Sequence, residues 1–205
     1  MTVPTLAQAQ QMLQEAANLN PGPWVDHSLC VAAAARALAE HHPDLDPEWA
    51  YIYGLMHDIG RRAGVHDLRH ILDGYSYLME RGFEQAARIC MTHSFPLQDV
   101  DAGAGVWDCT ADEKALVASY LASVTYNEYD RLLQLCDALA LPSGFCLLEK
   151  RFVDVVRRRG FNALTLQKWE AWLKLERSFS QVVGGSIYVH LPGVVQTTFG
   201  VSLRE

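Results

Sequence analysis

Apolar residues recur at helical spacing along most of the chain, and this pattern restricts the fold more than any other feature. Val31, Ala34 and Leu38 follow one another at intervals of three and four residues, which places them on one face of a helix. Only the tail from residue 187 onward alternates weakly, and it fits either a short strand or a last helical turn after Pro192. The sequence therefore predicts an all-α fold.

Start and stop signals divide the pattern into separate helices. Asp46, Pro47 and Glu48 form a helix start, with aspartate as the N-cap, proline at the first helical position and glutamate in the first turn. Gly82 is typical of a helix end. The helices are expected over residues 4–18, 24–41, 47–58, 68–81, 84–93, 111–122, 128–140, 145–159 and 165–182. The loops at 59–67 and 94–110 share one end of the bundle if the helices alternate in direction.

Size and composition favour one globular domain over residues 1–205. The chain has 205 residues, enough for a single sizeable core, and a net charge of −7. This acidic balance gives no support for nucleic acid or an anionic membrane as a partner. No secretory leader and no apolar run of roughly 18 residues is evident. The five cysteines have no paired spacing, so free thiols and a cytoplasmic location are expected.

Several imidazoles and carboxylates fall on core-facing stripes or at helix ends. An aspartate on an apolar stripe, such as Asp137 between Leu133 and Ala140, needs a cation because an unpaired buried carboxylate is costly. Imidazoles combined with carboxylates are the usual ligands of first-row transition metals. The candidate ligands are His27, His57, Asp58, His70, His93 and Asp137.

The order of these residues resembles a known family. His27, then the pair His57-Asp58, then Asp137 resemble the H…HD…D signature of the HD-domain superfamily of metal-dependent phosphohydrolases, in which the doublet often reads HDIG, as it does here. The stretches "HILDG" from His70 and "ICMTHSF" around His93 resemble the further ligand positions of members that bind two metals. The resemblance covers about residues 24–140 and implies an HD-type helical bundle. Residues 141–205 form a helical extension that is expected to shape the substrate pocket.

The resemblance implies a ligand set and a chemistry. His27, His57, Asp58 and Asp137 would hold one divalent ion, while His70 and His93 would complete a second, with Asp58 bridging both. The ions would be Fe, Mn, Ni, Co or Zn. A metal-activated water would then cleave a phosphoester or phosphoanhydride of a nucleotide or another small phosphorylated metabolite. The positive charge of two divalent ions would exceed the negative charge of the two aspartates. The pocket would then attract an anionic substrate even in an acidic protein.

The loop after the doublet supplies further candidates for the site. Arg61, Arg62 and Arg69 are predicted to bind phosphate oxygens, with Arg61 preferred because relatives commonly carry Lys or Arg just after HDIG. Arg61 and Asp58 are also assigned to catalysis. His66 is a candidate proton donor to the leaving group or an outer-shell residue, although the pattern favours a simple exposed loop histidine.

Two other functions are compatible with the same ligands. One is a mixed-valent di-iron oxygenase of the same superfamily, and the other is a nucleotide-binding sensor without turnover. Outside the pattern, the basic run at 155–160 is interpreted as a helix end, and Trp169, Trp172 and Phe179 as core. His41, His42 and His190 are expected at the surface. The sequence leaves a homo-oligomer open, with the apolar helix at 165–182 as its candidate interface.

Overall fold

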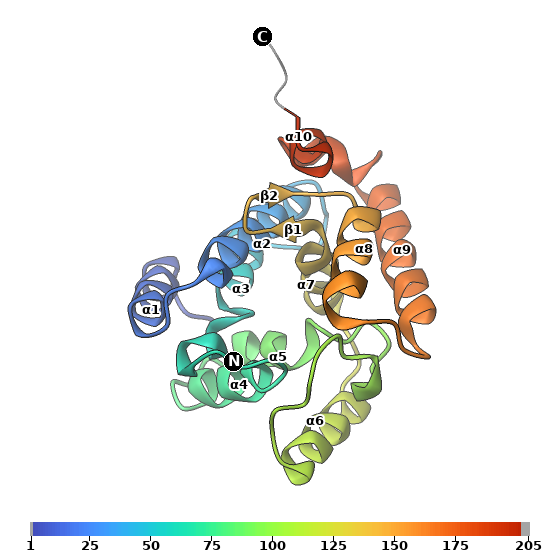
Figure 1. Ribbon diagram of the computed structural model, residues 1–205. Coiled ribbons are helices and arrows are strands. Elements are labelled where there is room, and N and C mark those ends of the chain that lie inside the picture. The colour runs from blue at the N-terminus through green and yellow to red at the C-terminus, as the bar shows by residue number, and fades with distance from the viewer. Residues whose placement is uncertain (1, 202–205) are drawn as a thin grey trace.

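The computed structural model describes residues 2–201 and is built almost entirely of helices (Figure 1). The only strands in the described residues form one small hairpin. The elements in chain order are α1 (Leu6–Leu19), α2 (Pro23–Ala39), α3 (Pro47–Met56), the 3-10 helix η1 (Ile59–Ala63), α4 (His70–Met79), α5 (Glu84–Thr92), η2 (Val100–Ala102), α6 (Ala111–Ser123), α7 (Glu128–Leu139), β1 (Ala140–Leu141), β2 (Gly144–Phe145), α8 (Leu148–Arg159), α9 (Thr165–Val182), η3 (Ile187–His190) and α10 (Val194–Phe199). The expected all-α fold is confirmed.

Side-chain caps start several of these helices. The Asp46 carboxylate accepts hydrogen bonds from the backbone N–H groups of Glu48 and Trp49, as expected for the start of α3. Capping boxes begin α1, α6 and α7, the last one between Asn127 and Asp130. These caps fix where α3 and α7 begin, and both helices carry residues of the candidate site.

The core is centred on α2, whose small residues let α3 approach closely. A β-carbon on Gly54 would lie only 2.3 Å from the Cα of Ala32, so position 54 has room only for glycine at this crossing. Val31, Ala34 and Leu38 are fully buried, as their spacing predicts. A smaller apolar cluster that includes Leu68, Ile71, Met91 and Phe95 seats α6 against α4 and α5.

The structure corrects two expectations and decides a third point that the sequence left open. Residues 140–145 form a hairpin in which Ala140 pairs with Phe145 and Leu141 with Gly144, so α8 begins at Leu148 instead of residue 145. The tail adopts helix after Pro192, which settles the open choice at that point. His42, expected at the surface, is buried with its ring 5.7 Å from that of Phe179. Within residues 2–201, no helix combines the length and apolar character needed to cross a membrane.

The elements after residue 141 lie on one side of the molecule. Helices α8 and α9 run next to each other and contact α7, which itself contacts α2 (Figure 1). This arrangement places the C-terminal helices opposite α4 and the loop that follows α5. A cavity lies between the two sides and is lined from both.

Candidate metal centre

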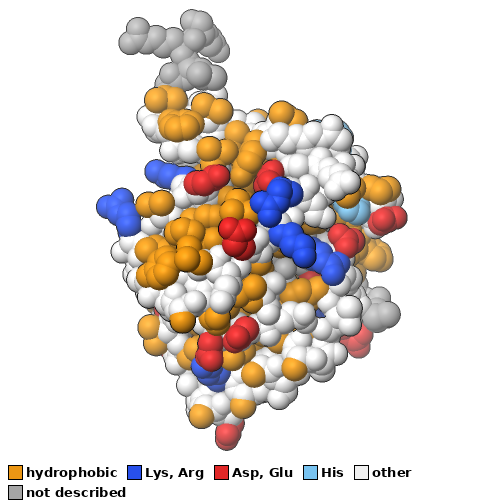
Figure 2. Space-filling view, turned by 90° about the vertical axis from the view of Figure 1, so that its right-hand side faces the viewer, with side chains coloured by type: hydrophobic (Ala, Val, Ile, Leu, Met, Phe, Trp, Pro, Cys, Tyr) orange, Lys and Arg blue, Asp and Glu red, His pale blue; other side chains and the backbone are white. Residues whose placement is uncertain are grey.

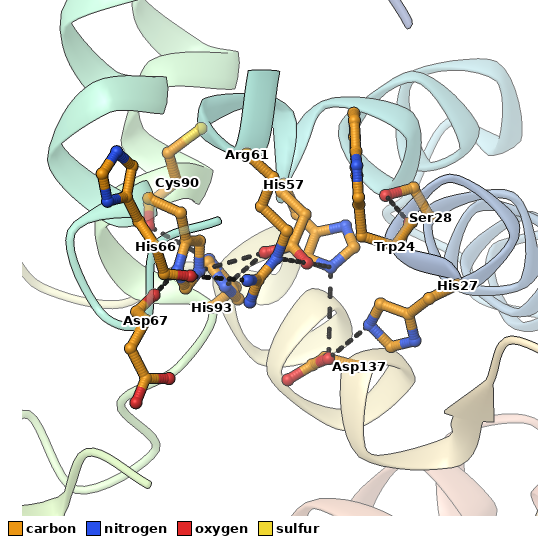
Figure 3. A network of polar contacts seen from close by, with 12 residues as sticks. Trp24, His27, Ser28, His57, Arg61, His66, Asp67, Cys90, His93 and Asp137 are labelled. Atoms are coloured by element: carbon orange, nitrogen blue, oxygen red, sulfur yellow. Dashed lines mark hydrogen bonds and ion pairs between the residues drawn. The ribbon is translucent and has the colours of Figure 1, made fainter. Parts of the chain in front are cut away.

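Five helices bring the six predicted ligands to one point. His27 comes from α2, His57 and Asp58 from the end of α3, His70 from the start of α4, His93 from the end of α5 and Asp137 from α7. Figure 3 shows His27, His57, His93 and Asp137 pointing toward one another from their separate elements. The four imidazoles and Asp58 are buried.

Asp58 lies between two groups of imidazoles. Its Oδ2 is 3.9 Å from Nε2 of His57, whereas its Oδ1 is 3.0 Å from Nε2 of His70 and 3.7 Å from Nε2 of His93. Two sets of donor atoms can each surround one ion, and within each set the atoms lie within 4.8 Å of one another. One set is His27, His57 and Asp58, and the other is Asp58, His70 and His93.

Asp137 joins the group from the opposite side. Its Oδ1 is 2.9 Å from Nε2 of His27 and 4.0 Å from Nε2 of His57 (Figure 3). Metal ligation by His27 through this nitrogen requires the imidazole to give up any proton it shares with Asp137, so metal binding and proton release are coupled here.

The backbone fixes the direction of three imidazoles. Nδ1 of His57 lies 2.7 Å from the Gly54 carbonyl oxygen, Nδ1 of His93 lies 3.0 Å from that of Cys90, and Nδ1 of His70 contacts that of Asp67. A carbonyl accepts only, so each Nδ1 carries the proton and each Nε2 keeps a lone pair that faces the cluster. This is the tautomer that a metal-ligating histidine needs.

Two of these inward nitrogens, Nε2 of His57 and Nε2 of His70, are buried and form no hydrogen bond with any residue between 2 and 201. Buried polar atoms in proteins are nearly always paired. Nitrogen and carboxylate donors at these spacings suit divalent first-row ions. The residues present therefore fit the two ions that the ligand order implies.

The electrostatics of the cluster favour neutral imidazoles and charged carboxylates. Burial lowers the pKa of His57, and it lowers the pKa of His93 to about 3, so both rings are neutral near pH 7. Burial alone would raise the pKa of Asp58, but the charge of the neighbouring Arg61 guanidinium outweighs this effect and holds that pKa well below its usual range. These are the protonation states in which both residue types bind a cation.

Two glycines allow η1 and α4 to meet. A β-carbon on Gly60 would lie 1.9 Å from the carbonyl oxygen of His70 and 2.4 Å from the backbone nitrogen of Gly74. A β-carbon on Gly74 would in turn lie 2.9 Å from Sγ of Cys90. The glycines of "HDIG" and "HILDG" therefore set the backbone distance at which Asp58 and His70 face each other.

Of the predicted substrate-binding residues, the structure brings one to the cluster. Nε of Arg61 donates to Oδ2 of Asp58 at 2.6 Å, and its Nη1 donates to the carbonyl of His66 at 3.2 Å. Asn20 supports this position by donating from Nδ2 to the Arg61 carbonyl at 2.6 Å. Arg61 also lines the cavity, so its guanidinium can contact a ligand held there.

The other three loop candidates lie elsewhere. The guanidinium of Arg62 stacks over the ring of Tyr77, with its Cζ 4.3 Å from the ring centroid. Arg69 forms ion pairs with Asp73 and Glu113. The ring of His66 lies 3.6 Å from the Asp108 carboxylate. None of these side chains lines the cavity in the described structure.

The cavity beside the cluster has a volume of about 660 Å³. Its remaining walls include Trp24, Arg151 and Lys168, which the sequence pattern did not single out, and Arg159, which the pattern indicates only as part of a basic helix end. Arg159 forms an ion pair with Asp67 at 2.7 Å, which links the end of α8 to the loop before α4. Trp172, predicted to be core, is buried and lines the cavity as well.

Comparison with known proteins identifies one family. The HD domain matches residues 24–141, which is more than half of the chain. The match includes all six residues of the cluster, from His27 to Asp137. No curated protein and no solved structure matches the chain.

Proposed function

The chain belongs to the HD-domain family, a superfamily of metal-dependent hydrolases, and on this basis we propose that it is a phosphohydrolase with two divalent metal ions. It would cleave a phosphoester or phosphoanhydride of a small metabolite, with nucleotides among the candidates. The observation that carries the proposal is the position of Asp58, whose two oxygens face different imidazoles at 3.0 to 3.9 Å. A carboxylate in that position suits a bridging ligand.

The residues of the chain would divide the work as follows. His27, His57, Asp58 and Asp137 would hold one ion, and His70 and His93 the other, with Asp58 shared. When bound, such ions polarise phosphoryl oxygens and make a bound water acidic enough to supply hydroxide near neutral pH. Arg61 would donate its N–H groups to a phosphoryl oxygen and stabilise the charge that develops there.

The contacts of Arg61 support this role. Its Nε–H is bonded to Asp58 and its Nη1 to a backbone carbonyl, so the guanidinium is held at the cluster instead of extending into solvent. A preorganised donor costs little reorganisation when charge develops. His66, the candidate proton donor, contacts Arg61 only through its backbone carbonyl, and its ring lies beside Asp108. We therefore assign protonation of the leaving group to water.

Phosphate release after metal depletion tests the proposal. The protein would be treated with a chelator, reloaded separately with Mn, Co, Ni, Zn or Fe under anaerobic conditions, and assayed on a panel of phosphomonoesters, phosphodiesters and nucleotides. We expect phosphate or nucleoside monophosphate to form only in reloaded protein and to fall by about 10³-fold or more in Asp58→Asn, since the shared ligand is weakened. Gln11→Ala, on the exposed face of α1, is the matched control and should keep full activity.

Two results would overturn the hydrolase assignment. Oxygen consumption that depends on iron, without phosphate release from any substrate, would identify an oxygenase. Tight binding of a nucleotide that stays intact with every metal would identify a binding protein without turnover.

A further inference from the structure

The C-terminal helices present two basic side chains to the cavity that the hydrolytic chemistry does not use. Arg151 of α8 and Lys168 of α9 both line the cavity and both lie outside the matched HD domain. On the side of the molecule that carries α8 and α9, several basic side chains gather near the centre, with acidic and apolar side chains beside them (Figure 2). In a chain with a net charge of −7, such a local group of cations calls for an explanation.

Lys168 is a buried ammonium group with one hydrogen bond. The residue is 6 % exposed, and its Nζ donates to the carbonyl of Ala102 at 2.7 Å. Its Nζ also lies 4.9 Å from the ring centroid of Trp172. Within residues 2–201 no carboxylate reaches this nitrogen closely enough for an ion pair. An ammonium has three donors, and burying its charge without a counter-ion is costly.

Arg151 has two carboxylates at ion-pair distance but lacks a hydrogen bond from its guanidinium to any described residue. Its side chain is 18 % exposed, and its Nη2 and Nη1 lie 3.8 Å from Asp137 and 3.9 Å from Asp154, too far for hydrogen bonds. The guanidinium makes no hydrogen bond to any described residue. Both carboxylates have closer partners, His27 for Asp137 and Arg158 for Asp154.

The two cations also act on each other. Burial lowers the pKa of Lys168 to about 8; Asp137 opposes this effect and Arg151 adds to it. Lys168 therefore carries its charge at pH 7 while a second positive charge lies nearby. Two cations with unused donors on one cavity wall are stabilised by an anion that accepts from both.

We propose that Arg151 and Lys168 form a subsite for a second anionic group of the substrate, a phosphate or a carboxylate. This inference rests on the proposed function, in which the metal-binding cluster and Arg61 hold the phosphoryl group that reacts. The substrate class is then a small phosphorylated metabolite with a second negative group. The cavity of about 660 Å³ has room for both groups, since pockets for such ligands span roughly 300–1,000 Å³.

Binding of inorganic pyrophosphate to the metal-free protein, measured by calorimetry, tests the subsite without any turnover. We expect Lys168→Met and Arg151→Met each to weaken binding about tenfold, the size of one charge-assisted hydrogen bond. Lys168→Arg keeps the charge and should retain binding. Lys174→Met removes an exposed lysine from the same helix and should have no effect. Melting temperatures of the two methionine variants show that they are folded.

Unchanged affinity in both methionine variants, or no pyrophosphate binding by the wild type, would overturn the subsite. Loss of binding in Arg61→Met alone would also overturn it, because the anion would then lie only at the cluster.

Paired substrates separate this inference from the proposed function. Glycerol 3-phosphate and 3-phosphoglycerate differ in whether a carboxylate accompanies the ester. If the subsite exists, 3-phosphoglycerate should have the higher kcat/KM because its KM is lower. Lys168→Met should lose this preference. Equal hydrolysis of both members overturns the subsite and leaves the hydrolase intact. Pyrophosphate binding that depends on both cations, without hydrolysis of any ester or anhydride by the metal-loaded protein, supports the subsite and overturns the hydrolase.

Discussion

The α-position of Gly60 lies directly against the backbone of His70, so closely that a β-carbon on Gly60 would be 1.9 Å from the His70 carbonyl oxygen. This contact holds η1 against the first turn of α4. It sets the 3.0 Å approach between Oδ1 of Asp58 and Nε2 of His70. The packing of two backbones thus determines whether the second group of ligands can form.

Gly60→Ala should separate these backbones and weaken both the fold and the metal site. We expect the free energy of unfolding to fall by about 2 kcal/mol, within the range for overpacked positions, and metal affinity to fall with it. Urea unfolding of the metal-free protein and a competitive metal titration measure the two effects. Gly185→Ala is the control, because a β-carbon there meets no atom of the described part of the chain within 4 Å. Equal behaviour of the two variants would contradict the role of the close contact.

Asp130 of α7 holds α5, the helix that ends just before His93. This carboxylate is fully buried and accepts hydrogen bonds from Arg88 at 3.0 Å and from Oγ1 of Thr92 at 2.8 Å. Asp130→Ala leaves Arg88 without its counter-ion, so we expect a loss of about 3 kcal/mol in the free energy of unfolding. Urea unfolding measures it, with Glu128→Ala as the control, since Glu128 pairs with Arg131 in a solvent-exposed position. A loss no larger than that of the control would contradict the prediction.

The buried histidines predict how stability depends on pH. The pKa of His93 is lowered to about 3 and that of His57 is also lowered, so the folded state holds these rings neutral while the unfolded state protonates them near pH 6.5. Their contribution is therefore complete above pH 6.5 and is lost as the pH falls toward 3. Urea unfolding of the metal-free protein at pH 7.5, 6.0 and 4.5 should show the decline, and His93→Gln should make it shallower. An identical slope in that variant would contradict the assignment.

The six residues of the cluster could be selected from the sequence, because each lies at the end of a helix or on a core-facing stripe. Their order also resembles that of the HD-domain superfamily. Arg62 shows where such reasoning fails. It follows Arg61 directly, but the 3-10 turn of η1 rotates successive side chains by about 120°, and Arg62 stacks on Tyr77 instead. Nothing in the local pattern around Lys168 predicts burial, since a lysine on an amphipathic helix is usually solvated. Its environment depends on Ala102, which is 66 residues away in the chain.

Arg61 should matter more for turnover than for metal binding. Arg61→Met removes the donor to Asp58 and the proposed donor to the substrate, but none of the six candidate ligands. We expect kcat to fall by about 10²-fold, which is typical when an enzyme loses one hydrogen-bond donor to the transition state. The metal content should not change. Arg62→Met, which loses only the contact with Tyr77, is the matched neighbour. Similar kcat values in the two variants would show that Arg61 has no role in the reaction.

The central claim is that one aspartate joins two metal-binding groups, and the metal content of the protein tests it most directly. Wild-type protein and the double variant His70→Ala/His93→Ala would be reloaded with the same ion, desalted and analysed for bound metal per chain. The two sets of donors around Asp58 predict two ions in the wild type and one in the variant, which keeps His27, His57, Asp58 and Asp137. A single ion in both proteins would contradict the dinuclear centre and exclude His70 and His93 as ligands.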